Sequence, residues 1–209
     1  PWETVSDPVS DVTLTIAAGL DGEALHLLDN TAGAQAELIQ EFDPVTQVVV
    51  DYYMRSDNAD HEGVFVMLGG DVGSDYTLSF GNESGGSGRR GWIGLFGGSG
   101  GWIVPEFLEY EEGRWYHVRR TLDAANDEGT FYVAAVDDNG DDIASKSYTH
   151  SIGSNYVNNT VDRVYVWTSG SQKADAYLDS LSITEYDPPS NTAPVAYYPF
   201  DGDASDASG

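Results

Sequence analysis

Three stretches of the chain each place an arginine and at least one aromatic residue on the same side of an alternating pattern. Successive side chains of a strand point to opposite faces, so the apolar positions predict a buried face and the other positions an exposed one. The side chains predicted to be exposed are Asp51, Tyr53 and Arg55, then Trp115, His117 and Arg119, and finally Arg163, Tyr165 and Trp167. Aromatic rings stack on sugar faces, and arginine forks hold carboxylate or sulfate groups. The pattern therefore predicts one sheet face that binds an acidic, uronate or sulfated, polysaccharide.

The glycine-rich stretch 85–101 and the residue directly after it add two tryptophans to this prediction. Trp92 and Trp102 are candidate stacking platforms on a loop beside the glycan groove. A flexible hairpin is the alternative interpretation. The stretch lacks the G-x-x-x-x-G-K-[ST] pattern that cradles phosphate before a helix.

Short alternating runs separated by Gly, Asn, Asp and Ser clusters predict strands and turns, whereas helical periodicity is nearly absent. The segment 137–140 is a hairpin turn by composition. About thirteen strands without a helix predict an all-β, two-sheet antiparallel sandwich of jelly-roll type. The predicted strands are Val12–Ala17, Ala24–Leu28, Ala36–Phe42, Val48–Arg55, Val64–Leu68, Tyr76–Phe80, Gly91–Phe96, Trp102–Val104, Trp115–Leu122, Phe131–Val136, Ile143–Tyr148, Val161–Thr168 and Ala174–Thr184.

Composition excludes several classes of protein. The 209 residues include 35 acidic and nine basic side chains, for a net charge of −26, which opposes binding to nucleic acid or to an anionic membrane. Forty percent hydrophobic residues suffice for a core, and no apolar run approaches a membrane span.

Asp outnumbers Glu 23 to 12 and only two lysines occur, which favours a saline habitat. The chain has no cysteine. We expect a monomeric sandwich.

The end of the sequence predicts a domain boundary. Three prolines occur within residues 187–195, which indicates a stiff linker after a sandwich domain at 1–186. Residues 196–209 are too few to fold alone and predict the beginning of a following domain.

Two motifs give a resemblance to a known superfamily. The run Gly113-Arg114-Trp115-Tyr116-His117-Val118 resembles the G-x-W-x-H-V strand of concanavalin A-like, laminin-G-like jelly rolls. Residues 176–183 resemble the closing strand of the same superfamily, and residues 197–209 resemble the opening strand of a second laminin-G-like domain. The resemblance implies an extracellular or cell-surface, multidomain, glycan-directed protein.

The resemblance also implies one structural calcium ion where an early strand meets the closing strand. Asp179 matches the closing-strand acid of that site, and its expected partners are Asp29, Asn30 and Asp11. Calcium takes six to eight oxygen ligands, which this chain supplies easily. The four histidines lack zinc-binding spacing.

Two functions rival non-catalytic binding. A polysaccharide lyase would use the same face, with His117, Tyr53 or Tyr165 moving the proton and Arg119 or Arg55 neutralising the uronate carboxylate. The alginate-lyase motifs R-[ST]-E-x-R and Q-[IV]-H are absent, as is the E-x-D-x-x-E string of retaining glucanases. A structural or adhesion spacer is the second rival, in which the polar side chains pair with surface acids or cover the sheet against a neighbouring domain.

Overall fold

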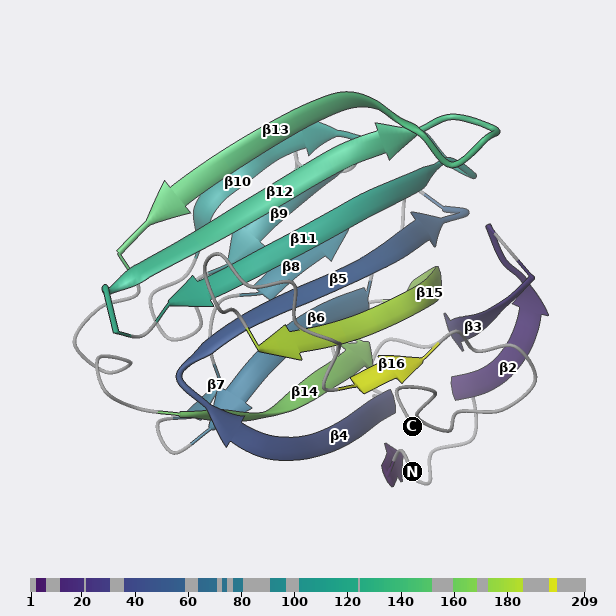
Figure 1. Cartoon of the computed structure of the whole chain (residues 1–209). Coiled ribbons are helices and arrows are strands. Elements are labelled where there is room, and N and C mark those ends of the chain that lie inside the picture. Colours follow the sequence, from purple (N-terminus) through teal and green to yellow (C-terminus); the bar gives the residue numbers. More distant parts are fainter. Residues whose placement is uncertain are drawn as a thin grey trace.

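A computed structural model describes residues 3–6, 12–20, 22–30, 36–58, 64–70, 73–74, 77–80, 91–96, 102–123, 125–151, 160–168, 173–185 and 196–198. These residues form strands and turns in two antiparallel layers (Figure 1). None of them forms a helix that is long and apolar enough to cross a membrane. The predicted all-β, two-sheet antiparallel sandwich is confirmed.

The first layer, sheet A, runs in the order β1-β4-β14-β6-β8-β9-β10, and β7 pairs with β6. Its strands are β1 (Glu3–Ser6), β4 (Ala36–Val45), β14 (Val161–Thr168), β6 (Val64–Gly70), β7 (Gly73–Ser74), β8 (Thr77–Phe80), β9 (Trp92–Phe96) and β10 (Trp102–Glu109).

The second layer, sheet B, runs in the order β13-β12-β11-β5-β15-β3-β2, and β16 pairs with β15. Its strands are β13 (Asp142–His150), β12 (Glu128–Val136), β11 (Trp115–Asp123), β5 (Gln47–Ser56), β15 (Ala174–Glu185), β3 (Glu23–Asp29), β2 (Val12–Ala18) and β16 (Ala196–Tyr198).

Each of the thirteen predicted stretches overlaps a strand, although the stretch Trp102–Val104 covers only the beginning of β10. The sequence pattern misses β1, β7 and β16, which have four, two and three residues and are too short to show a period of two. Strand β16 lies in the segment predicted to open a following domain, and it pairs with Leu181–Ile183 of β15. The domain boundaries stay a prediction.

The core fills the space between the two sheets. Strand β5 alternates between intermediate and buried positions over its whole length, and Val48, Val50, Tyr52 and Met54 are the buried side chains expected from the sequence. Each fully buried apolar side chain of this kind contributes about 1.5–3 kcal/mol relative to exposure. The outward side chains of β5 are consequently held in fixed positions, because the buried ones fix the strand's register.

Strand β11 has buried polar residues as well as apolar ones, and His117 is buried although the alternation predicts it to be exposed. Tyr116, Val118 and Leu122 are buried as predicted, and Arg120 on the same inward face is buried with them. Its guanidinium carbon lies 4.6 Å from the ring centre of Phe131, which replaces part of the lost hydration with a cation–π contact.

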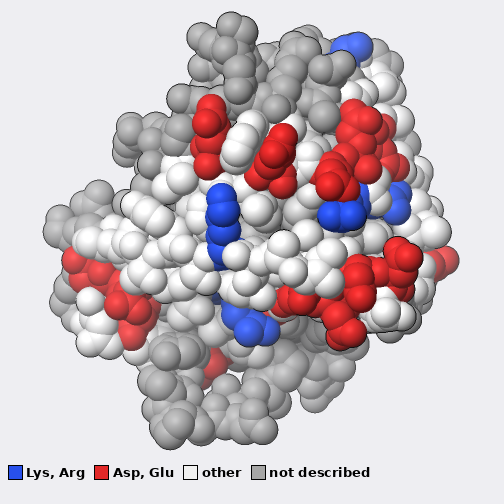
Figure 2. Space-filling model, turned by 90° about the horizontal axis from the view of Figure 1, so that it is seen from above, with Lys and Arg blue, Asp and Glu red and all other residues white. Residues whose placement is uncertain are grey.

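Acidic side chains outnumber basic ones on the face of the molecule that Figure 2 shows. When the molecule is viewed from above the orientation of Figure 1, the acidic side chains form several separate clusters with a few basic side chains between them (Figure 2). This distribution follows from the 35 acidic and nine basic residues in the sequence.

Candidate functional site

Strands β5 and β11 bring two of the three predicted groups of side chains together. They pair antiparallel, with Trp115 opposite Arg55 and His117 opposite Tyr53. Arg119 is opposite Asp51 in the same register. Because the buried side chains of both strands point into the core, these six point away from it and form one patch on the outer face of sheet B.

The third predicted group lies elsewhere. Arg163, Tyr165 and Trp167 are on β14, which belongs to sheet A, so the core separates them from the patch. Arg163 pairs with its neighbour Asp162, with Nε 2.6 Å from Oδ1, and this charge raises its pKa. The prediction that all three strands form one face is therefore wrong for β14, because alternation gives the side of a strand but not the sheet to which it belongs.

The first row of the patch is a stack of four planar side chains across four neighbouring strands. His26 lies face to face with Tyr177, with ring centres 4.2 Å apart and an interplanar angle of 2°. The guanidinium of Arg55 lies 4.0 Å from the ring centre of Tyr177 and 5.1 Å from that of Trp115. The distances between these planar groups match the distance between adjacent strands, so the sheet itself holds the four side chains in place.

Carboxylates fix the two basic members of this stack. Nε of Arg55 lies 2.8 Å from Oδ1 of Asp57, and its terminal nitrogen donates to Oδ2 at 3.1 Å. Nε2 of His26 lies 2.8 Å from Oδ1 of Asp175. The guanidinium of Arg55 is therefore already bound to a carboxylate of the protein itself.

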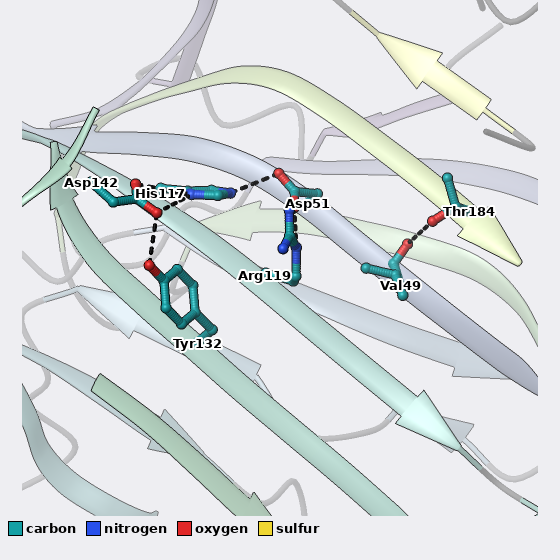
Figure 3. A network of polar contacts seen from close by, with 7 residues as sticks. All are labelled: Val49, Asp51, His117, Arg119, Tyr132, Asp142 and Thr184. Atoms are coloured by element: carbon teal, nitrogen blue, oxygen red, sulfur yellow. Dashed lines mark hydrogen bonds and ion pairs between the residues drawn. The ribbon is translucent and has the colours of Figure 1, made fainter. Parts of the chain in front are cut away.

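The second row is a network of polar contacts centred on His117 (Figure 3). Nε2 of the imidazole lies 2.9 Å from Oδ1 of Asp51, and Nδ1 lies 3.0 Å from Oδ2 of Asp142. The Tyr132 hydroxyl donates to the same Oδ2 at 2.7 Å, and Nε of Arg119 donates to Oδ2 of Asp51 at 2.5 Å. The network joins β5, β11, β12 and β13.

The two carboxylates favour the protonated form of His117. An ionised carboxylate only accepts hydrogen bonds, so contacts to both ring nitrogens stabilise the imidazolium, in which both nitrogens donate. Burial alone lowers the pKa of His117, but the hydrogen bonds and charges of Asp51 and Asp142 outweigh it and raise the pKa above its ordinary value. Burial and the charge of Asp51 likewise raise the pKa of the Tyr53 hydroxyl. The raised pKa of each group works against its acting as a general base.

An open groove of about 570 Å³ lies beside Trp115. Trp115 lines this groove, and the guanidinium of Arg55 lies 5.1 Å from the ring centre of the same indole. The lining residues come from the β2–β3 turn, the loop before β11 and the β12–β13 turn. They are Gly19, Leu20, Glu111, Glu112, Gly113, Arg114, Trp115, Val136, Asp137, Asp138 and Ile143.

The expected calcium ligands do not come together. Thr168 of sheet A donates to Oδ2 of Asp29 at 3.3 Å, so Asp29 faces the interior, whereas the backbone nitrogen of Leu20 donates to Oδ2 of Asp179 at 2.8 Å. Asp29 pairs with Ala174, roughly 16 Å along β15 from Asp179 at the usual strand rise. Asn30 is exposed next to Asp29, and Asp11 lies outside the described residues. The ligand set proposed from the sequence does not fit one ion.

No other metal cluster replaces it in the part of the chain that the structure describes. No group of three or more His, Asp or Glu side chains there has a suitable arrangement.

The two glycine-rich-loop tryptophans lie in sheet A. Trp92 begins β9 and is partly buried, and Trp102 begins β10. Both are therefore on the other layer from the patch. The Trp102 and Trp167 side chains, and residues 81–90 and 97–101 of the loop, lie outside what the structure describes.

Several members of the patch were not expected from the sequence. Tyr177 and His26 complete the stack, and Asp142 and Tyr132 complete the network. The alternation of Asp175, Tyr177 and Asp179 along β15 is a signal for the first pair, because the residues between them are small or apolar. No sequence signal marks Asp142, which reaches the patch through a register shift next to Val136.

Comparisons with known proteins give the fold. No family model matches the chain, and no curated protein matches it. A solved structure titled sialidase superposes with a TM-score of 0.60 at 16% identity, covering 89% of this chain and 17% of that one. The structure of peanut lectin with a nine-residue peptide superposes with a TM-score of 0.54 at 12% identity, covering 84% of this chain and 94% of the lectin chain.

A GH131 β-glucanase catalytic domain from Podospora anserina gives a TM-score of 0.53 at 17% identity, over 83% of this chain and 75% of that one. This chain spans only about a sixth of the sialidase chain, so the likeness concerns one domain of it. At these identities the likeness concerns the fold: the chain shares the two-sheet antiparallel sandwich of these structures.

Proposed function

We propose that this domain binds carbohydrate without cleaving it, on the outer face of sheet B. The observation that supports this most is the position of Trp115, an indole that contacts the guanidinium of Arg55 and lines an open groove. An aromatic ring fixed at the wall of a groove is a suitable surface for the apolar face of a sugar. The structural neighbours include lectins, which agrees with the proposal.

The acidic-glycan specificity expected from the sequence depends on Arg119. Arg55 is half-buried between two rings, and its guanidinium binds Asp57. The Arg119 side chain is 53% exposed, and its Nε binds Asp51. A uronate or sulfate that reached the patch would therefore contact the terminal nitrogens of Arg119 and no other arginine of β5 and β11 on this face.

The lyase alternative has less support than binding. A β-eliminating enzyme needs a group that accepts a proton, whereas both ring nitrogens of His117 lie beside carboxylates that stabilise the protonated ring. The Tyr53 hydroxyl has a raised pKa, which disfavours the phenolate that would act as base.

Native affinity electrophoresis tests the proposal. The protein is run in gels that contain alginate, pectin, ulvan, carrageenan, xylan or laminarin, and each gel is then stained for polymer. We expect retarded migration in at least one gel with the polymer intact. A cleared zone at the band would indicate a depolymerase, and free migration in every gel would favour the spacer function.

The remaining predictions concern the protein's context. Calcium binding, a saline extracellular location, further domains of the same polypeptide and a monomeric state stay predictions from the sequence. Calorimetry with calcium, and size-exclusion chromatography with light scattering, would test the first and the last.

A further inference from the structure

We propose that the groove beside Trp115 is a subsite for an uncharged sugar residue and that it excludes uronates and sulfated sugars. This inference rests on the proposed carbohydrate-binding function and names the ligand class of that site. It differs from the acidic glycan expected from the sequence, because it depends on the groove and not on the arginines of the patch.

The first step of the argument is the position of Trp115 in the wall of the groove. Trp115 begins β11, the strand between β5 and β12. The guanidinium of Arg55 lies 5.1 Å from its ring centre and is itself held by Tyr177 and Asp57, so the indole has a fixed neighbour. The groove that Trp115 lines also contains Val136 and Ile143, which add apolar surface.

The second step is the size of the groove and the rigidity of its walls. A volume of about 570 Å³ is within the range of small-ligand sites and is ample for one sugar ring. The loop before β11 is fixed by a bond from Gly113 N to Ser56 O at 2.9 Å and by one from Glu111 N to the Tyr116 hydroxyl at 2.8 Å. Such a site is largely formed before the ligand arrives, which reduces the entropy lost on binding.

The opposite wall is also held by its own hydrogen bonds. Oδ1 of Asp137 accepts from the backbone nitrogens of Asn139 and Asp141, at 2.9 and 3.0 Å. These bonds keep the β12–β13 turn closed, and Gly140 takes a positive φ of 86° that suits glycine in such a turn. The turn therefore presents Asp138 at the groove in one conformation.

The third step is the charge of the lining. Four of its residues are acidic, Glu111, Glu112, Asp137 and Asp138, and the basic one, Arg114, pairs with Glu111 at 3.1 Å. Carboxylate oxygens accept hydrogen bonds from sugar hydroxyls, whereas they repel a ligand carboxylate or sulfate. The ring and the cavity supply the binding surface, and the carboxylates supply the selectivity.

The test compares glycans that differ only in charge. Laminarin, galactomannan and methyl-esterified homogalacturonan are the uncharged members, and the carboxylated members are the C6-oxidised forms of the first two and de-esterified homogalacturonan. Affinity electrophoresis at two salt concentrations gives a dissociation constant for each polymer. We expect an uncharged member to bind, and its carboxylated counterpart to bind at least about tenfold more weakly at low salt, with a smaller ratio at high salt.

Two tryptophan variants separate the groove from the rest of the surface. Trp115→Ala should weaken binding of the uncharged polymer by roughly tenfold, whereas Trp92→Ala on sheet A should leave it unchanged. Circular dichroism and thermal unfolding of both variants check that they fold. The double variant Glu112→Gln/Asp138→Asn should reduce the discrimination against the carboxylated polymer.

The outcomes distinguish this inference from the proposed function. Preferential binding of the carboxylated members would overturn the inference and leave carbohydrate binding supported. Equal loss of affinity in Trp115→Ala and Trp92→Ala would also overturn it. Free migration past all six polymers would overturn both proposals.

Discussion

The carboxylate of Asp142 lies 3.0 Å from Nδ1 of His117, although 25 positions and the whole of β12 separate the two residues. The contact is possible because the ladder between β12 and β13 shifts register next to Val136, which turns Asp142 toward the patch. With Asp51 on the other nitrogen, the imidazolium ties the edge hairpin β12–β13 to the middle of the sheet.

This contact predicts how stability depends on pH. The folded-state pKa of His117 is raised, so its contribution is fully present below the unfolded-state value near 6.5 and is lost as pH rises through the folded-state pKa. We expect the free energy of unfolding to fall between neutral and alkaline pH. Urea unfolding at constant ionic strength, followed by tryptophan fluorescence from pH 6 to pH 10, measures it.

The matched variant for this prediction is His117→Gln, with His26→Gln as the control. His117→Gln should be less stable at pH 6 and should lose most of the decline toward alkaline pH. If the decline persists unchanged in His117→Gln, another group causes it.

Asp51 has a lowered pKa through His117 and Arg119, so acid unfolding should begin at a higher pH once Asp51 is replaced by Asn.

The stack predicts that Arg55 cannot be replaced by lysine. Lysine keeps the charge but cannot lie flat between Tyr177 and Trp115 or bind Asp57 through two nitrogens. Arg55→Lys should lower the free energy of unfolding by about 1 kcal/mol and weaken glycan binding severalfold. Arg163→Lys on sheet A should change stability by less than about 0.5 kcal/mol and leave binding intact. Equal effects of the two variants would contradict the role given to the stack.

Burial predicts a large difference between two isoleucines of sheet B. Ile183 is fully buried in β15, whereas Ile16 in β2 is 43% exposed. Ile183→Ala should cost about 2–5 kcal/mol, because it removes buried methylene groups and leaves a cavity. Ile16→Ala should cost less than about 0.5 kcal/mol. Chemical denaturation of both variants, fitted with a common m-value, checks the prediction. Similar denaturant midpoints for the two variants would contradict the placement of the core.

The β2–β3 turn has no room for a side chain at Gly19. A Cβ there would be 2.5 Å from Oδ2 of Asp179 and 3.0 Å from the backbone carbon of Glu23. Gly19→Ala should therefore break the bond from Leu20 N to Asp179 and cost about 1–3 kcal/mol. Gly113→Ala is the control, since nothing lies within 4 Å of its Cβ and only the positive φ of 76° opposes it. Thermal unfolding should place Gly19→Ala below Gly113→Ala; the reverse order would refute the close approach.

The sequence alone determined the strands and the direction of their side chains. Alternation is a local property, and it correctly predicted that Val48, Val50 and Met54 are buried in β5. It also correctly predicted that Tyr53 and His117 are on the outer face of the sheet, because the apolar residues between them fix the face. The predicted exposure of His117 is wrong, because the residue is buried at 8% exposure between Asp51 and Asp142.

Tertiary structure decided which strands are neighbours and what each outward side chain meets. The pairing of β11 with β5 brought Trp115 beside Arg55, whereas the assignment of β14 to sheet A removed Arg163 and Tyr165 from the patch. Sheet order depends on contacts between distant segments, which a pattern with a period of two does not encode. The same contacts bind the guanidinium of Arg55 to Asp57 and place His117 between two carboxylates. They therefore change the chemistry that the residue types suggest by themselves.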